Sequence, residues 1–245
     1  MTKEVYRHEL KYLINMPDWA LLRPRLAAVI GRDANAGPGG EYHIRSLYFD
    51  DYWDSAYEEK DMGVLTRCKY RIRLYNCSDR LIRLERKAKY GAYIRKEGAP
   101  LDRAQVGMIL DGDYGFLRRS DHSLHQQFYF ELTSRLMRPR VIVDYDREPF
   151  AMEAGDVRIT FDKHVRAGFG PFSLFDPALP ACEALPGDRM IMEVKFTEFL
   201  PGAVRRLLPP RASELTAASK YVLCCDAAAR TQFIDRTEGL PWRTR

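Results

Sequence analysis

Residues 69–75 read Lys-Tyr-Arg-Ile-Arg-Leu-Tyr, and residues 82–89 read Ile-Arg-Leu-Glu-Arg-Lys-Ala-Lys. Each stretch places a charged side chain at every second position, with mainly apolar side chains between them. Because the side chains of a strand alternate between its two faces, both stretches are predicted to be strands with one charged face and one apolar face. Residues 76–80 are short and polar, so the strands are predicted to form a hairpin with its turn at 76–80.

The same alternation recurs in residues 7–12, 157–162 and 192–196. Two interpretations are open. An ordinary antiparallel sheet shows one polar face to water. In a barrel of about eight strands, by contrast, the apolar faces would pack outward against helices and the polar faces would line the interior.

The segments between the strands predict an α+β fold with a mainly antiparallel sheet, because strands and helices do not alternate regularly. Loops are predicted at residues 31–40 and 168–187, which are rich in glycine and proline. Tyr48, Phe49 and Tyr57 are expected to cover the outer face of the sheet. Helices are predicted over residues 17–30, 54–61, 102–110, 123–136, 203–208 and 213–229.

The composition indicates a globular protein with a net charge of +5. Its length of 245 residues fits one domain over 1–245, with a C-terminal tail predicted at 227–245. The five cysteines include no Cys-x-x-Cys, so neither a disulfide framework nor a zinc site is expected. No apolar leader and no apolar run long enough for a membrane span is visible. A soluble, cytoplasmic protein is therefore predicted.

Common catalytic motifs are missing from the sequence. It has no phosphate-binding loop of the Gly-x-x-x-x-Gly-Lys type, no Gly-x-Gly-x-x-Gly, and no Gly-x-Ser-x-Gly. An active site must then be built from Arg, Lys and Glu. That set suits phosphoryl transfer, where positioning and charge neutralisation dominate. Glutamates among such bases are natural oxygen ligands for Mg²⁺ or Mn²⁺.

Eight short motifs follow one another along the chain: Arg7–Tyr12, Ser46–Asp50, Lys69–Tyr75, Leu84–Lys87, Tyr145–Arg147, Arg158–Asp162, Met192–Lys195 and Ser219–Tyr221. In this order they resemble the catalytic domain of the vacuolar transporter chaperone (VTC) family, a branch of the CYTH-like triphosphate tunnel metalloenzymes. The resemblance covers residues 4–226. Arg7 stands where adenylate cyclase and thiamine-triphosphatase relatives have the first Glu of Glu-x-Glu-x-Lys, which favours the VTC branch.

The resemblance implies an eight-stranded antiparallel tunnel with a basic interior and helices packed outside. It also implies a polyphosphate polymerase that transfers the γ-phosphate of ATP to a growing chain, with Mn²⁺ (or Mg²⁺) as cofactor. The implied phosphate-binding bases are Lys11, Arg71, Arg73, Lys87, Arg147 and Arg158. Glu193 is the implied metal ligand, and Ser219 and Lys220 are implied phosphate contacts. Lys69, Lys89 and Lys195 lie on the same strand faces and are added as phosphate-binding candidates.

Several roles remain open at the level of sequence. Glu85 is a second candidate metal ligand, or it neutralises Arg71 or Lys87. Asp162 either binds metal or orients an arginine, and Glu193 either binds metal or pairs with Lys195 or with a neighbouring strand. Lys87 is expected to face Arg71 and Arg73 across the hairpin, so that the three bases repel one another when no anion is bound.

The expected partners are ATP and inorganic polyphosphate or triphosphate, with no nucleic acid and no direct membrane span. A membrane-protein partner remains unknown. Two alternative functions stay open beside the polymerase. One is a tripolyphosphatase or nucleotide triphosphatase on the same fold, and the other is a non-catalytic polyphosphate-binding module.

Overall fold

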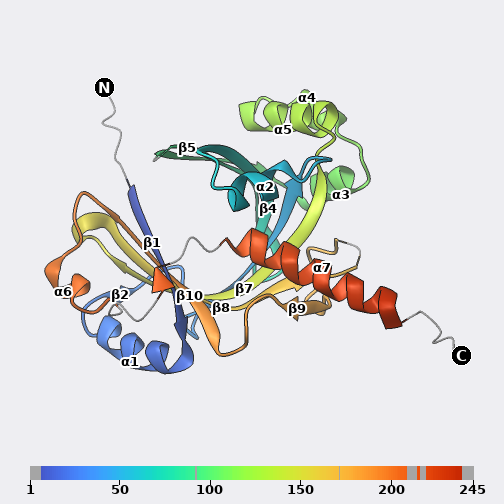
Figure 1. Cartoon of the computed structure of the whole chain (residues 1–245). Coiled ribbons are helices and arrows are strands. Elements are labelled where there is room, and N and C mark those ends of the chain that lie inside the picture. Colours follow the sequence, from blue (N-terminus) through green and yellow to red (C-terminus); the bar gives the residue numbers. More distant parts are fainter. Residues whose placement is uncertain (1–6, 92, 171, 209–213, 216–218, 239–245) are drawn as a thin grey trace, which may run out of the picture. The chain divides into compact units, whose positions relative to one another are not determined.

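The computed structural model describes residues 7–91, 93–170, 172–208, 214–215 and 219–238. The chain forms two compact units (Figure 1). Unit 1 comprises Met1–Ile44, Tyr145–Val165 and Leu185–Ala218, and unit 2 comprises Arg45–Asp144, Arg166–Ala184 and Ser219–Arg245. Three long strands run through both units: β3 (Tyr42–Asp50), β7 (Arg138–Met152) and β8 (Val157–Gly168).

Unit 1 holds the strand order β11-β1-β10-β8-β7, with β2 paired to β7. Its other elements are β1 (Arg7–Asn15), α1 (Met16–Ala27), β2 (Gly31–Arg32), η1 (Ala154–Asp156), β10 (Arg189–Thr197), α6 (Gly202–Arg205) and β11 (Glu214–Leu215). Helix α1 begins at a capping box, in which the Asn15 side chain accepts from the Asp18 backbone N–H at 2.8 Å. Its buried Leu22 and Leu26 join a core with Ile14, Ile159 and Val194. The apolar strand faces of unit 1 therefore pack against helices.

Unit 2 holds the order β7-β3-β4-β5-β6, with β9 paired to β8. Its elements are α2 (Ser55–Asp61), β4 (Thr66–Tyr75), β5 (Ser78–Tyr90), β6 (Tyr93–Leu101), α3 (Arg103–Leu110), α4 (Gly115–Arg118), α5 (Ser123–Ser134), β9 (Ala181–Glu183) and α7 (Lys220–Glu238). The core joins Ile72 and Leu84 of the hairpin to Val106 of α3 and Phe128 of α5. Figure 1 shows α3, α4 and α5 together beside these strands.

The predicted hairpin is confirmed, but its turn is tighter than 76–80. Strand β5 begins at Ser78, and both Asn76 and Cys77 have positive φ, 53° and 51°, as the two central residues of a type I′ turn require. The register shifts between Arg73 and Tyr75. This irregularity absorbs the difference between a five-residue and a two-residue connection.

The α+β fold with an antiparallel sheet is confirmed, since every ladder with a described register is antiparallel. The prediction of a closed eight-stranded barrel does not hold for the hydrogen-bonded sheet. Its strand order is a path with two ends, β11 and β6, and no ladder among the described residues joins them. The count differs from eight because β2, β9 and β11 have only two or three residues, too few to show alternation in sequence.

Five of the six predicted helices match α1, α2, α3, α5 and α6 to within a few residues. The helix predicted over 213–229 is displaced, because Glu214–Leu215 is a strand and α7 runs over Lys220–Glu238. No glycine or proline interrupts the sequence from residue 220 to 238. Part of the predicted tail at 227–245 is therefore helical, and residues 239–245 lie outside the described residues. Across the part of the chain that the structure describes, no helix is both long and apolar enough to cross a membrane.

Candidate functional site

The candidate residues from the sequence divide between the two units. Within each unit the candidates on strands lie on the polar strand faces, opposite the helix-covered cores, and Ser219 and Lys220 lie at the start of α7. Unit 1 carries Lys11, Arg147, Arg158, Glu193 and Lys195, and unit 2 carries Lys69, Arg71, Arg73, Glu85, Lys87, Lys89, Ser219 and Lys220.

In unit 1 the charges form rows across the sheet. Glu9 of β1 pairs with Lys195 of β10, and the next polar row pairs Lys11 with Glu193. On the other side of β10, Arg158 lies opposite Lys195. Acidic and basic residues thus alternate both along and across the β1–β10 ladder, which reduces the repulsion that a purely basic face would have.

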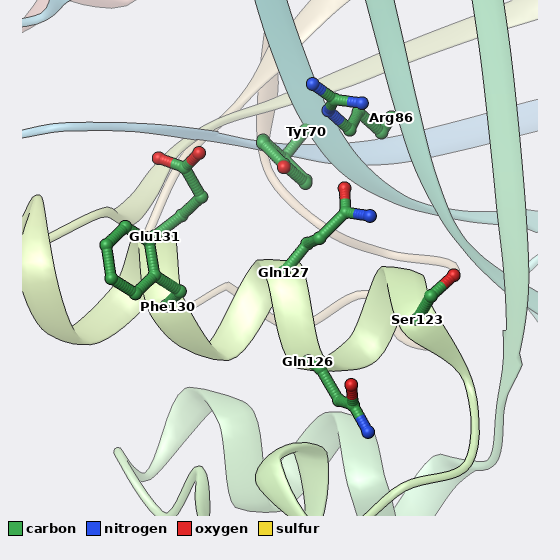
Figure 2. A pocket seen from close by; sticks show the side chains of 7 residues that line it. All are labelled: Tyr70, Arg86, Ser123, Gln126, Gln127, Phe130 and Glu131. Atoms are coloured by element: carbon green, nitrogen blue, oxygen red, sulfur yellow. The ribbon is translucent and has the colours of Figure 1, made fainter.

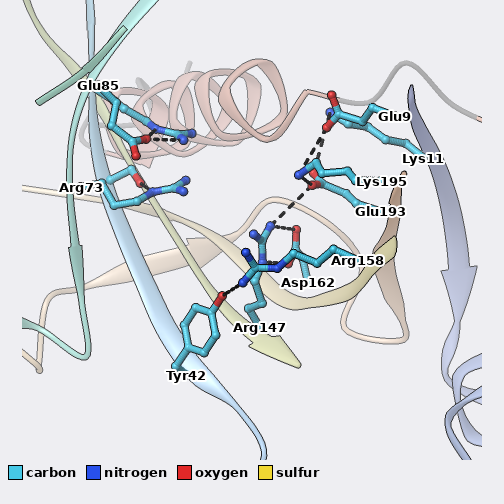
Figure 3. Close-up of polar contacts among 12 residues, drawn as sticks. Glu9, Lys11, Tyr42, Arg73, Glu85, Arg147, Arg158, Asp162, Glu193 and Lys195 are labelled. Atoms are coloured by element: carbon cyan, nitrogen blue, oxygen red, sulfur yellow. Dashed lines mark hydrogen bonds and ion pairs between the residues drawn. The ribbon is translucent and has the colours of Figure 1, made fainter. Parts of the chain in front are cut away.

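Glu193 is the centre of these rows (Figure 3). It is buried, at 5% exposure. Its Oε2 lies 2.7 Å from Lys195 Nζ and 3.6 Å from Arg147 Nη2, and its Oε1 lies 3.8 Å from Lys11 Nζ. Three predicted bases therefore converge on Glu193, one of the two predicted metal ligands. Glu9, which sequence analysis did not select, contacts both lysines at 3.6–3.7 Å.

Arg147 is held by a bidentate contact with Asp162, with Nε donating to Oδ1 at 2.6 Å and Nη2 to Oδ2 at 2.8 Å. Burial alone would lower the pKa of Arg147, but Asp162, Tyr145 and Glu193 outweigh it and hold that pKa well above its ordinary value. Of the two roles left open for Asp162, the structure supports the arginine orienter. The fork geometry fixes the direction of the guanidinium.

Arg158 contacts two groups that sequence analysis missed. Its Nη2 lies 3.0 Å from Asp33 Oδ2 and donates to the Tyr42 hydroxyl at 3.2 Å. Burial raises the pKa of Asp33, but hydrogen bonds from Asn35 and the charge of Arg158 outweigh it, so that pKa is lowered. Arg158 Nε is buried and has no hydrogen-bond partner among the described residues. The guanidinium therefore retains an unused donor.

In unit 2 the predicted position of Lys87 is wrong. The register places Lys87 opposite Lys69, whereas Glu85 lies opposite Arg71. Arg71 Nε donates to Glu85 Oε2 at 2.7 Å, and Lys96 Nζ lies 2.7 Å from Glu85 Oε1. These contacts favour the neutralising role of Glu85. Its metal role stays a prediction.

The charge of Glu85 is strongly stabilised. Burial would raise its pKa, but Arg71, Arg73 and Lys96 outweigh burial and hold the pKa at about 2. Arg73 is itself buried, at 7% exposure, and its Nε donates to Ser46 Oγ at 3.1 Å. Arg73 and Glu85 are too buried to belong to a fully solvated outer face, so that interpretation is wrong here.

Tyr48 was expected on the outer face of the sheet, but it lies on the charged face. Its hydroxyl accepts from Arg71 Nη1 at 2.7 Å, and its ring stacks on Tyr221 at 5.0 Å between centroids. The signal was present in the sequence. Ser46, Tyr48 and Asp50 have the same parity on β3, so the face that carries Ser46 also carries Tyr48.

Ser219 and Tyr221 bring the start of α7 to Lys69. Lys69 Nζ donates to Ser219 Oγ at 3.4 Å and lies 4.3 Å from the centroid of the Tyr221 ring. The Tyr221 hydroxyl donates to Asp50. Lys220, the first residue of α7, and Lys89 are half-buried. Lys89 lies opposite Arg67 in the ladder.

A pocket in unit 2 lies on the other face of the hairpin (Figure 2). It has a volume of about 520 Å³, and Tyr70 and Arg86 line it together with residues of α5 such as Gln127 and Phe130. Tyr70 lies opposite Arg86 in the ladder. Tyr70 is next to Arg71 in the sequence, and Arg86 is next to Glu85. They therefore point to the helix side, and none of the predicted site residues lines this pocket.

The sequence matches the model of one known protein family. The model of the VTC domain matches residues 6–229. The chain belongs to the VTC domain family. The motifs from Arg7 to Tyr221 thus lie within the matched region of this VTC domain.

Several solved structures are similar to this VTC domain at low sequence identity. A putative adenylate cyclase from Bacillus halodurans has 9% identity and a TM-score of 0.46, over 97% of this chain and 92% of that one. A protein from Pyrococcus horikoshii OT3 has 10% identity and a TM-score of 0.45, over 86% and 96%. A conserved hypothetical protein from Pyrococcus furiosus has 9% identity and a TM-score of 0.43, over 89% and 99%. No functionally curated protein matches the chain.

Proposed function

We propose that this VTC domain is a metal-dependent phosphotransferase that moves the γ-phosphate of ATP onto a growing inorganic polyphosphate chain. Membership of the VTC domain family over residues 6–229 is the observation that carries the proposal. We also propose that the polar strand faces enclose the polyanion as a tunnel. The burial of Arg73, Arg147 and Glu193 on these faces supports it.

In this proposal the bases bind and orient phosphate groups. Arg147, fixed by Asp162, presents a directed guanidinium, and Arg158 offers an unused Nε donor. Arginine forks match phosphate oxygens, and lysines act as point charges. The remaining bases, Lys11, Lys69, Arg71, Arg73, Lys87, Lys89, Lys195 and Lys220, would neutralise the charge of the chain. The acceptor phosphate is already an anion and needs no base to activate it.

The residues around Glu193 fit a hard divalent cation in part. Thr160 lies opposite Glu193 in the β8–β10 ladder, and its Oγ1 is buried without a hydrogen-bond partner among the described residues. Mg²⁺ and Mn²⁺ take oxygen ligands, and Mg²⁺ often binds through one or two carboxylates together with substrate phosphates. No group of three or more acidic, His or Cys side chains that could hold a metal occurs in the described parts of the chain. Glu193 and Thr160 would therefore hold the ion only together with phosphate oxygens, whose charge it would neutralise.

A hydrolase is the second candidate, because one group near neutrality is available to accept a proton from water. Burial lowers the pKa of Lys69 to about 7. A neutral amine could act as the base that deprotonates the attacking water. A transferase needs no such base, because its acceptor phosphate is already an anion. The hydrolase would release orthophosphate in place of polymer.

One assay separates the candidates. Purified protein is incubated with ATP and Mn²⁺, and the products are resolved by gel electrophoresis and by an orthophosphate assay. Long polymer supports the polymerase. Formation of ADP with equimolar orthophosphate would show that the protein is a hydrolase and not a polymerase. Unchanged ATP, together with binding of tripolyphosphate, would show a non-catalytic binding module.

A further inference from the structure

Lys69 has an environment unlike that of the other bases in unit 2. In the described part of the chain it takes part in no ion pair; its amine contacts the Ser219 hydroxyl and the face of the Tyr221 ring. Lys87, also a base, lies directly opposite it in the ladder. The side chain of Lys69 is half-buried, so solvent and a ligand still reach it. It is thus a basic group that makes no direct ion pair with an acidic side chain in the described residues.

Two further contacts hold the Tyr221 ring in place beside Lys69. Its hydroxyl donates to Asp50, and its ring stacks on Tyr48 at 5.0 Å. Asp50 in turn accepts from the backbone N–H groups of Asp51 and Ala56 at 3.0 and 2.8 Å. The aromatic face beneath Lys69 is therefore held in place before any ligand arrives. Ser219 leaves its own hydroxyl proton available to an incoming acceptor, because its oxygen is the acceptor of the Lys69 contact.

Burial and the charges around Lys69 together favour its neutral form. Burial lowers its pKa most, Lys60 of α2 and Arg67 of β4 lower it further, and Asp50 and Cys225 offset part of this, which leaves the pKa at about 7. Burial raises the pKa of Cys225 to about 11, so its thiol is neutral near pH 7 and offsets little. Lys69 is then protonated in only part of the molecules at neutral pH. A phosphate group beside the amine would favour the charged form.

We propose that Lys69, Ser219 and Tyr221 form an anion subsite that takes up one proton from solvent when a phosphate group binds. The inference rests on the proposed function, since the phosphate group would belong to ATP or polyphosphate. No covalent bond forms or breaks: the proton moves from solvent to Lys69 Nζ, and the resulting ammonium binds the phosphate oxygens. An ammonium does not deprotonate water, so proton uptake by Lys69 would remove the base that the hydrolase candidate requires and would favour transfer.

Isothermal titration calorimetry with sodium tripolyphosphate tests the proposal. Titrations at about pH 7.5 in buffers of different ionisation enthalpy give the number of protons taken up, because the measured heat varies linearly with the buffer enthalpy. Tripolyphosphate itself exchanges protons, so the quantity of interest is the difference between proteins. Lys69→Arg keeps the charge but remains protonated, since an arginine is not deprotonated in proteins. Lys89→Arg makes the same change on the partner strand and serves as the matched control.

The wild type and Lys89→Arg are expected to take up about half a proton to one proton more than Lys69→Arg. Lys69→Arg should also lose less affinity than the wild type when the pH is raised by one unit. Lys69→Gln, a second variant, should bind more weakly and show the same reduced uptake. Equal proton uptake in the wild type and Lys69→Arg would overturn the subsite while leaving the polyphosphate proposal in place. Absence of tripolyphosphate binding in the wild type would instead overturn the proposed function.

Discussion

Glu85 lies directly opposite Arg71 in the β4–β5 ladder, and Glu85 Oε2 is 2.6 Å from Arg71 Nη2. The other carboxylate oxygen of Glu85 is 2.7 Å from Lys96 Nζ. Glu85 therefore neutralises Arg71 and Lys96 on this face of the hairpin, where sequence alone indicates repulsion among Arg71, Arg73 and Lys87. A phosphate ligand must compete with Glu85 for the same donors of Arg71.

Arg71→Ala should destabilise the protein, because it leaves the buried Glu85 carboxylate with less compensation. Removing one partner of a buried ion pair costs about 3 kcal/mol of unfolding free energy. Urea denaturation measures this loss. Arg83→Ala, at an exposed position of the same hairpin, should change the unfolding free energy by less than about 0.5 kcal/mol. Equal effects of the two substitutions would show that the Arg71–Glu85 pair does not stabilise the fold.

The stability should fall in acid partly through Glu85. Its folded-state pKa is about 2 against an ordinary value of 4.5, so its contribution is complete above about pH 4.5 and is lost as the pH falls toward 2. Urea denaturation at about pH 5 and about pH 3 should show a larger loss for the wild type than for Glu85→Gln, which does not titrate. The same loss in both proteins would contradict the assigned cause.

Thr160→Val should separate stability from binding. The Thr160 hydroxyl is buried without a partner in the described structure, and an unsatisfied buried polar group costs about 1–3 kcal/mol. The melting temperature should therefore stay equal or rise, while the affinity for Mn²⁺ in the presence of tripolyphosphate falls.

Thr197→Val is the control for Thr160→Val. Thr197 Oγ1 donates to the Gly155 carbonyl at 3.2 Å, so its removal should lower stability by about 1 kcal/mol and leave Mn²⁺ affinity unchanged. A lower melting temperature for Thr160→Val with unchanged Mn²⁺ affinity would rule out a ligand-directed role for its hydroxyl.

Glu193→Gln should abolish turnover and leave the fold and tripolyphosphate binding largely intact, since it removes a charge and keeps the shape. Electron paramagnetic resonance of Mn²⁺ in the presence of tripolyphosphate gives a second readout, in which the bound signal should be lost. Glu9→Gln, which changes the carboxylate across the same two lysines, should retain bound Mn²⁺. Normal turnover of Glu193→Gln at saturating Mn²⁺ would place the metal elsewhere.

Local patterns in the sequence predict much of the fold. Alternation over 69–89 predicts the hairpin, and a turn centred on 76–80 already pairs Arg71 with Glu85, although Lys87 was expected there. The capping residues Asn15 and Asp102 mark the starts of α1 and α3. These features depend on neighbours in the chain, which is why they are readable from it.

Contacts between distant segments could not be predicted in this way. Tyr221 donates to Asp50 across 171 positions of sequence, and Arg147 finds Asp162 on another strand. Such pairs depend on how strands and helices pack, and charge alternation alone does not choose among several possible partners. The tunnel and the metal site depend on the same long-range packing and remain proposals.

The central claim is that the γ-phosphate of ATP is transferred to a phosphate chain and not to water. The most direct measurement follows ATP labelled at the γ-phosphate, incubated with the wild-type protein, Mn²⁺ and a short unlabelled polyphosphate. The account predicts that most of the label moves into chains longer than the added polyphosphate, with ADP formed and little labelled orthophosphate. Label recovered only as orthophosphate, in amounts equal to the ADP, would contradict it.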